Sequence, residues 1–207
     1  MYVSPVKSKH AIKPRLGRVD WLDAALEELK NAGINAIAIE KLAVQLGVTR
    51  GSFYHHFRDR VDLLTQMLDY WAENWTLEIR TEITALGLDA RQTLLALIRM
   101  IRHRKAAEYD VVFRAWALHD PVARKVVKRV DEFRLDYIRS LFGQLGFNEL
   151  EAENRARLFL YYEMTEPVMF ATQSKETRER LIEARHRLLT TMVVDSHTEM
   201  RAIKNTD

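Results

Sequence analysis

The sequence of 207 residues contains no cysteine, only four prolines and only seven glycines. Without cysteine the chain can form neither disulfides nor thiolate zinc sites. So few prolines and glycines leave little room for the many tight turns of an all-β fold. No apolar run approaches the ~18 residues of a membrane span, and no signal peptide is recognisable. We therefore expect a soluble, cytoplasmic, mostly helical protein that makes no contact with membranes.

Motifs for catalysis are also missing. The sequence has no Gly-rich phosphate loop and no Gly-x-Ser-x-Gly nucleophile motif. Its seven histidines lack the spacing of zinc ligands, and the adjacent His55 and His56 cannot easily face one ion from a helix. We therefore expect no enzyme, no catalytic residues, no metal site and no cofactor.

The net charge of +3 is concentrated near the N-terminus. Residues 1–60 hold ten Lys and Arg against six acidic residues, whereas the remaining chain carries a net −1. The first 18 residues contain five basic side chains and no acid, together with Pro5, Pro14 and Gly17. This composition predicts a flexible basic arm over residues 1–17 that suits a polyanion such as nucleic acid. A merely solvated tail has the same composition and is the alternative.

Apolar residues recur at helical spacing along the rest of the chain, and no long segment alternates with period two. This pattern predicts an all-α fold of about nine helices. Residues of the N-cap type, including Asp59, Asp89 and Asp120, precede several of the helices. The predicted helices span residues 18–31, 39–46, 50–57, 59–86, 90–106, 108–119, 121–145, 149–172 and 175–195.

Two of the short helices, 39–46 and 50–57, have the pattern of a helix-turn-helix. In the turn between them Gly47 can adopt a positive φ, and Thr49 offers an N-cap hydroxyl to the second helix. A helix-turn-helix places its second helix in the major groove of DNA. Gly51 weakens that helix but permits a close approach of the backbone to DNA. Side chains there that could reach phosphates or base edges are Arg50, Ser52, Tyr54, His55 and His56.

A long motif extends over about residues 18–65. It comprises Ala24-Ala25-Leu26, Gly33 and Ile39-x-x-Leu42-Ala43-x-x-Leu46-Gly47-Val48-Thr49-Arg50-Gly51-Ser52-Phe53-Tyr54-His55-His56-Phe57-x-Asp59-Arg60-x-x-Leu63-Leu64. This motif resembles that of the TetR family of bacterial regulators, and agreement over so many positions is specific. The other two thirds of the chain resemble the family only in helical character and length.

The resemblance implies a helix-turn-helix DNA-binding domain at residues 18–60 and a C-terminal helical ligand-binding and dimerisation domain at residues 61–207. It also implies a homodimer on a palindromic operator in double-stranded DNA. Arg60 stands where the family usually has a phosphate-contacting lysine. Ile37-Ala38 replaces the usual Thr-Ser or Thr-Thr, so a hydroxyl cap and one phosphate contact are lost there. The residues expected at DNA are Arg18, Ala38, Thr49, Arg50, Gly51, Ser52, Tyr54, His55, His56 and Arg60.

Aromatic and methionine side chains accumulate after residue 60. Such stripes are usually plain core, but the resemblance implies that some of them line a ligand pocket. Glu163 and Glu166 are either buried handles for a ligand or solvated, and we favour solvation. An apolar stripe near the C-terminus predicts a four-helix dimer interface; it consists of Leu181, Ala184, Leu188, Leu189 and Met192. The candidate ligand-binding residues are Trp71, Trp75, Phe113, Trp116 and Tyr162.

These features predict a DNA-binding transcriptional regulator. We expect a homodimeric repressor that a small, largely apolar effector releases from its operator by shifting the fourth helix. An activator, or a regulator without a small ligand, is an alternative within the same class. The alternative from another class is a helical scaffold or adaptor protein that keeps the fold but binds protein partners. The identities of the effector and the operator do not follow from the sequence.

Overall fold

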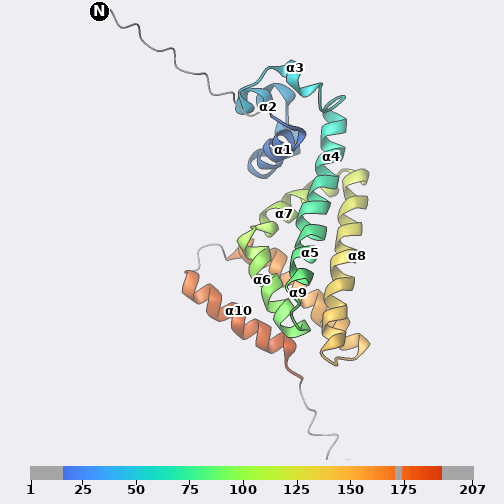
Figure 1. Ribbon diagram of the computed structural model, residues 1–207, viewed down its shortest axis with the longest axis vertical. Coiled ribbons are helices and arrows are strands. Elements are labelled where there is room, and N and C mark those ends of the chain that lie inside the picture. The colour runs from blue at the N-terminus through green and yellow to red at the C-terminus, as the bar shows by residue number, and fades with distance from the viewer. Residues whose placement is uncertain (1–15, 171–173, 193–207) are drawn as a thin grey trace, which may run out of the picture.

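The computed structural model describes residues 16–170 and 174–192, and this part of the chain contains helices and turns but no strand (Figure 1). The all-α prediction is therefore confirmed. The predicted arm over residues 1–17 lies outside the described residues except for Leu16 and Gly17. No helix in the described ranges is both long and apolar enough to cross a membrane.

The helices follow one another with short connections. A π-helical turn, η2, joins α4 to α5 without a break, so α4, η2 and α5 form one long helix. With these counted together, the described residues form nine helices and one 3₁₀ turn, in agreement with the predicted number. The elements are α1 Arg18–Ala32, η1 Ile34–Ala36, α2 Ile39–Leu46, α3 Arg50–Phe53, α4 Arg60–Ala72, η2 Glu73–Leu77, α5 Glu78–Ala85, α6 Ala90–His103, α7 Ala106–Ala117, α8 Pro121–Gln144, α9 Glu149–Met169 and α10 Lys175–Thr190.

Side-chain caps begin five of these helices. In each case a carboxylate, amide or hydroxyl oxygen accepts a hydrogen bond from a backbone N–H two or three residues further on, at 2.8–3.2 Å. These bonds satisfy N–H groups that have no partner within the helix. The capping residues are Asp59, Asp89, Asp120, Asn148 and Ser174.

The predicted helix over residues 50–57 is shorter in the structure. α3 ends at Phe53, and residues 54–56 continue as a turn in which the N–H groups of His56 and Phe57 both donate to the Phe53 carbonyl. Gly51 lowers the helix propensity of this segment, and the buried rings of Phe53 and Phe57 hold the turn on the core. The prediction was therefore wrong in placing His55 and His56 on a helix.

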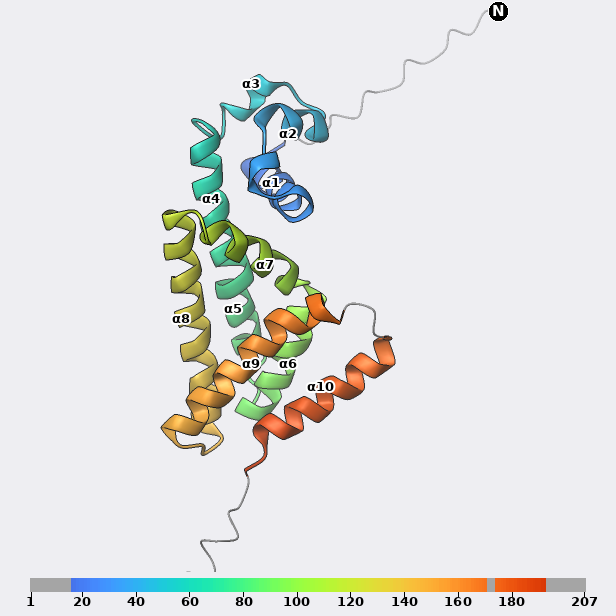
Figure 2. The same ribbon diagram turned by 180° about the vertical axis from the view of Figure 1, so that it is seen from behind.

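Two apolar clusters form the interior. The first packs α1–α3 and the early part of the long helix against α7 and the start of α8, and the second packs α5, α6, α9 and α10 against the later part of α8. Figures 1 and 2 show α1–α3 at one end of the molecule, with α8 alongside the long helix. The first cluster contains buried residues from both sides of residue 60. The predicted boundary between the two domains therefore lies within one continuously packed cluster.

The centre of the first cluster is a stacked pair of rings from two helices. Trp71 of α4 and Phe113 of α7 are both fully buried, with their ring centroids 4.4 Å apart. This stack joins α4, which begins directly after the helix-turn-helix, to α7 in the C-terminal part of the molecule. Loss of either ring would leave a large cavity where the two parts meet.

We predict that Phe113→Ala lowers the free energy of unfolding by about 3–5 kcal/mol, because a buried ring is removed from a packed interior. Val111→Ala, at a position on the same helix that is 40% exposed, is the control and should change it by less than about 0.5 kcal/mol. Urea denaturation measures both values. Equal effects of the two substitutions would contradict a central role for the stack.

Candidate DNA-binding surface and regulatory pocket

The reader segment, residues 49–57, is anchored by two of its own rings. Phe53 and Phe57 are buried and stack with centroids 5.2 Å apart, and Phe53 meets Trp21 of α1 edge to face at 5.3 Å. Between these anchors Tyr54 and His55 are exposed. The segment is thus fixed from inside while its polar aromatic side chains face outward.

The exposed Arg50 is oriented by two neighbours. Its guanidinium donates to the Tyr54 hydroxyl at 3.1 Å and forms an ion pair with Glu40 of α2 at 3.0 Å. Hydrogen bonding to Tyr54, followed by the charge of Glu40, raises the pKa of Arg50 above its ordinary value. Arg50 therefore stays charged, but Glu40 offsets part of the positive field of the reader segment.

The turn before α3 agrees only in part with its prediction. Gly47 has a φ of 68° and ends α2 in the left-handed conformation, as expected. Thr49 occupies the N-cap position, but its hydroxyl makes no capping bond, so that part of the prediction was wrong. Ser52 is half-buried, and Gly51 is exposed. A Cβ built on Gly51 would lie 3.7 Å from the Thr49 hydroxyl oxygen, an ordinary contact.

Arg60 fixes the corner before α2. Its Nε donates to the Ile37 carbonyl at 2.7 Å and its Nη2 to the Ile34 carbonyl at 2.6 Å. Ala38 is the N-cap of α2 and has no side chain that could cap the helix. The guanidinium therefore holds a corner that lacks the hydroxyl cap. Arg60 stays a predicted phosphate contact, with this structural role in addition.

Of the remaining predicted residues, Arg18 flanks the reader segment and His56 lies within it. Arg18 is exposed, with its guanidinium carbon 5.9 Å from the centre of the Phe57 ring, and His56 is half-buried. Arg58 is a further exposed basic residue next to the reader segment that was not among the residues predicted at DNA. Its side chain is 88% exposed beside the reader segment, with Asp62 at 3.7 Å. Its place directly after Phe57, the second anchor, was the available signal.

Two phenols tie α1 to the rest of the molecule. Tyr70 of α4 donates to Asp23 at 2.8 Å, and Tyr109 of α7 donates to Glu27. Burial, followed by the hydrogen bond to the neighbouring carboxylate, raises the pKa of each tyrosine to about 12. Both phenols therefore stay protonated donors over the whole physiological range.

The π-turn η2 in the long helix directs its carbonyls toward arginines. A π-turn breaks the regular hydrogen-bond pattern, and such turns are frequent at functional sites. Arg134 of α8 donates to the Trp75 carbonyl at 3.1 Å and to the Thr76 hydroxyl at 3.1 Å. The same guanidinium pairs with the buried Asp110 of α7 at 2.7 Å. One cation thus connects η2, α7 and α8.

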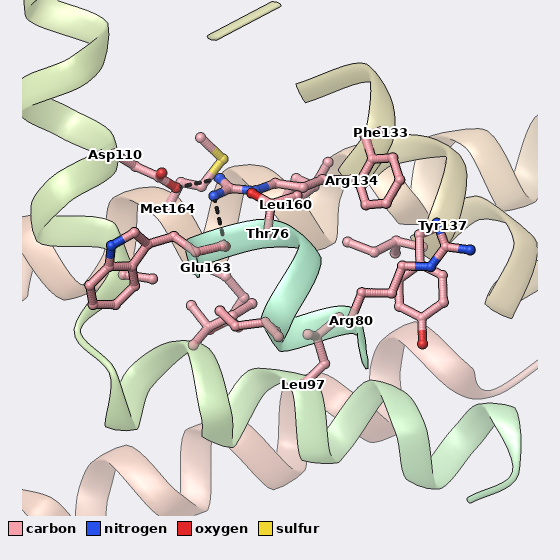
Figure 3. Close-up of a pocket in the computed structure, with 15 residues that line it drawn as sticks. Thr76, Arg80, Leu97, Asp110, Phe133, Arg134, Tyr137, Leu160, Glu163 and Met164 are labelled. Carbon is pink, nitrogen blue, oxygen red and sulfur yellow. Dashed lines mark hydrogen bonds and ion pairs between the residues drawn. The ribbon is translucent and has the colours of Figure 1, made fainter. Parts of the chain in front are cut away.

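A pocket lies beside this turn, between η2–α5 and α6–α9 (Figure 3). Its walls are mainly apolar, with Asp110 on the left of the view, the Arg134 guanidinium reaching across toward it, and Arg80, Phe133 and Tyr137 on the right. Concave sites with apolar walls and a few placed polar groups are typical of small-molecule binding. Sequence reasoning missed these five residues, because charged side chains and scattered aromatics carry no sign of a shared cavity.

Of the five predicted ligand-binding residues, only Trp75 lines this pocket. Trp71 and Phe113 form the buried stack described above, and Trp116 packs in the same core cluster. Tyr162 lies under the Arg185 guanidinium, whose carbon is 3.7 Å from the centre of the ring. Four of the five predicted residues therefore lie outside the pocket. Trp71, Phe113 and Trp116 belong to the apolar core instead, which is the usual place of such aromatic side chains.

Glu163 and Glu166 are buried rather than solvated, so the preference for solvation was wrong. Arg102 pairs with both carboxylates, at 3.2 Å to Glu163, and Arg185 pairs with Glu163 from α10. Burial raises the pKa of Glu163, and the two guanidiniums oppose that rise. The network joins α6, α9 and α10 next to the pocket, because Glu163 is also one of the residues that line it.

An exposed helix-turn-helix, joined by a long helix to a helical domain with a pocket, defines a class of DNA-binding regulators. The family model for bacterial regulatory proteins of the tetR family matches residues 22–67. A curated relative, the HTH-type transcriptional repressor KstR2 of Rhodococcus jostii (strain RHA1), is 27% identical over 135 residues, which are 65% of this chain. The matched region spans 64% of that repressor's length.

Solved structures with this fold extend the likeness over most of the chain. A transcriptional regulator from Rhodococcus sp. Rha1 has a TM-score of 0.66 at 15% identity and covers 84% of this chain and 96% of its own. FadR from Bacillus subtilis, solved in complex with stearoyl-CoA, has a TM-score of 0.64 at 16% identity over 86% of this chain and 100% of its own. The chain is thus similar to bacterial regulatory proteins of the tetR family, in sequence over residues 22–67 and in fold over most of its length. This likeness agrees with the prediction of a transcriptional regulator rather than an enzyme.

We predict that Glu163→Gln lowers the free energy of unfolding by about 3 kcal/mol, because it leaves two buried guanidiniums without their shared anion. Glu179→Gln is the matched control. Its carboxylate lies 4.0 Å from Arg99 at the exposed surface, where an ion pair contributes at most about 1 kcal/mol. Thermal and urea unfolding would reveal the difference, and a neutral Glu163→Gln would show that the network contributes little net stability.

Proposed function

We propose that this protein is a transcriptional repressor that binds DNA through its helix-turn-helix. The observation that carries the proposal is the reader segment, in which buried Phe53 and Phe57 hold Tyr54 and His55 toward solvent. A rigidly held, outward-facing polar surface next to a positive-φ turn suits contact with the major groove. The match of residues 22–67 to the tetR family model and the likeness to a curated repressor support this proposal.

We also propose a small-molecule effector that acts through the pocket. A ligand there would touch Asp110, and the preceding residue, Tyr109, donates to Glu27 of α1. The pocket also includes Trp75 and Thr76 of η2, which directly follows α4. Binding would therefore bias the position of α1 and α4 together, and so change the spacing of two reader segments in a dimer. The complex of FadR with stearoyl-CoA supports a small-molecule effector for a protein of this fold.

A homodimer is the third part of the proposal. The surface of α9 and α10 exposes large apolar side chains: Leu158 at 58%, Tyr161 at 59%, Leu181 at 38% and Leu188 at 75%. An isologous contact would bury these side chains against the same helices of a second copy, in a four-helix interface. Two reader segments related by a two-fold axis would then match a palindromic operator.

Binding of the purified protein to DNA upstream of its own gene, titrated against salt, tests the central proposal. We expect a complex with a sequence preference whose affinity falls by about a thousandfold between 50 and 200 mM salt, as phosphates release their counterions. A complex with no sequence preference at any salt concentration would overturn the proposal and favour a helical adaptor that binds proteins.

Gly51→Ala locates the DNA-binding surface. Alanine should stabilise the fold by up to ~1 kcal/mol, because a helical glycine is replaced without a clash. At the DNA surface, however, the added methyl group should weaken operator binding by about tenfold or more. Gly143→Ala, at an open helical position of α8, is the matched control and should leave DNA binding unchanged. Equal operator affinities of Gly51→Ala and Gly143→Ala would indicate that α3 is not part of the DNA-binding surface.

Leu188→Glu tests the dimer. A charge at this exposed position would be buried without a partner in the proposed interface, and we expect the mass in solution to fall to that of one chain. Leu118→Glu, at a position 70% exposed on another face, is the control. A Leu188→Glu protein that stays dimeric would rule out this interface.

A further inference from the structure

Arg80 at the pocket is a cation without an anionic partner among the described residues. Its guanidinium carbon lies 4.8 Å from the centre of the Phe133 ring and 5.2 Å from that of Tyr137, and no carboxylate pairs with it in the described part of the chain. Two rings from α8 thus hold a charged group in place at the pocket wall (Figure 3). Such contacts position a guanidinium and leave its N–H donors available.

The other charges around the pocket are already balanced. Arg134 pairs with Asp110, while Arg102 and Arg185 share Glu163 and Glu166. Each of these pairs is largely buried, as charges removed from water require. The surplus at this site is therefore one positive charge, and Arg80 carries it.

The rest of the pocket favours an apolar body. The pocket lining includes aliphatic side chains, among them Ile79, Leu97 and Leu160. Asp110 has one buried carboxylate oxygen without a hydrogen-bond partner, so that side would repel an anion. The two ends of the pocket are therefore electrostatically different, and only the Arg80 end suits a negative group.

We propose that the effector is an amphipathic anion whose terminal carboxylate or phosphate binds Arg80 and whose apolar part fills the pocket. This inference rests on the proposed effector site and specifies its ligand. A forked guanidinium binds a carboxylate or phosphate through two parallel hydrogen bonds, which makes it selective for such head groups. Exposure of Arg80 at the pocket mouth lets the head group keep contact with water.

Four probes with the same eight-carbon chain test the proposal by calorimetric titration of the full-length protein: octanoate, octyl phosphate, 1-octanol and octylammonium. We expect at least one of the two anions to bind about tenfold or more tightly than 1-octanol, and octylammonium to bind most weakly. Which anion binds more tightly identifies the head group. Binding of 1-octanol as tight as that of both anions, or no binding of either anion, would overturn the proposal.

Arg80→Gln assigns the preference to this side chain. Arg80→Gln should remove the tighter binding of the anions relative to 1-octanol, and Arg80→Lys should retain part of that difference. The control Arg99→Gln removes an exposed charge outside the pocket and should retain all of it. An anion preference that survives in folded Arg80→Gln overturns the assignment. Operator binding is measured in parallel without probes. If the protein does not bind an operator, the proposed function is wrong. If it binds an operator but shows no preference among the probes, only the proposal of an anionic effector is wrong.

Discussion

The buried Asp110 is the constraint on which much of the structure depends. A carboxylate that is 3% exposed must be paired or lose its charge, and Arg134 supplies the partner from α8. The same guanidinium reaches the Trp75 carbonyl and the Thr76 hydroxyl, so it also accommodates the π-turn of the long helix. A regular α-helix would retain more of its carbonyls in internal hydrogen bonds. The charge pair and the irregular turn therefore stabilise each other.

The polar interior has a different role from the apolar one. The Trp71–Phe113 stack and its neighbours supply the bulk of the buried apolar surface between α4 and α7. The ion pairs of Arg102, Arg134 and Arg185 cost desolvation and give less net stability, but they accept few alternative geometries. Apolar packing holds the helices together, and the buried ion pairs fix the positions of α8, α9 and α10 near the pocket. Among the described residues that line the pocket, Arg80 is the one cation without an anionic partner.

Local patterns made the fold predictable, and long-range pairing made the pocket unpredictable. The caps at Asp59, Asp89 and Asp120 act within three residues, so the sequence shows them directly. The reader segment could be located in the same way, from its turn and its two anchoring rings. By contrast, Glu163 is separated by 61 residues from Arg102 and by 22 from Arg185. A single sequence does not show which distant cation pairs with a given carboxylate. For that reason the prediction that Glu163 and Glu166 are solvated was wrong.

The position of the π-turn has a mechanical consequence. The thirteen residues of α4 place η2 about 20 Å from the cap at Asp59, at ~1.5 Å of rise per residue. A tilt of the helix by ~10° about η2 would then carry the reader segment through an arc of about 3.5 Å. With such a tilt, the long helix would pivot at η2, beside the pocket, and the reader segment would move at its far end. In the proposed dimer, such a displacement would change the separation of the two reader segments relative to successive major grooves.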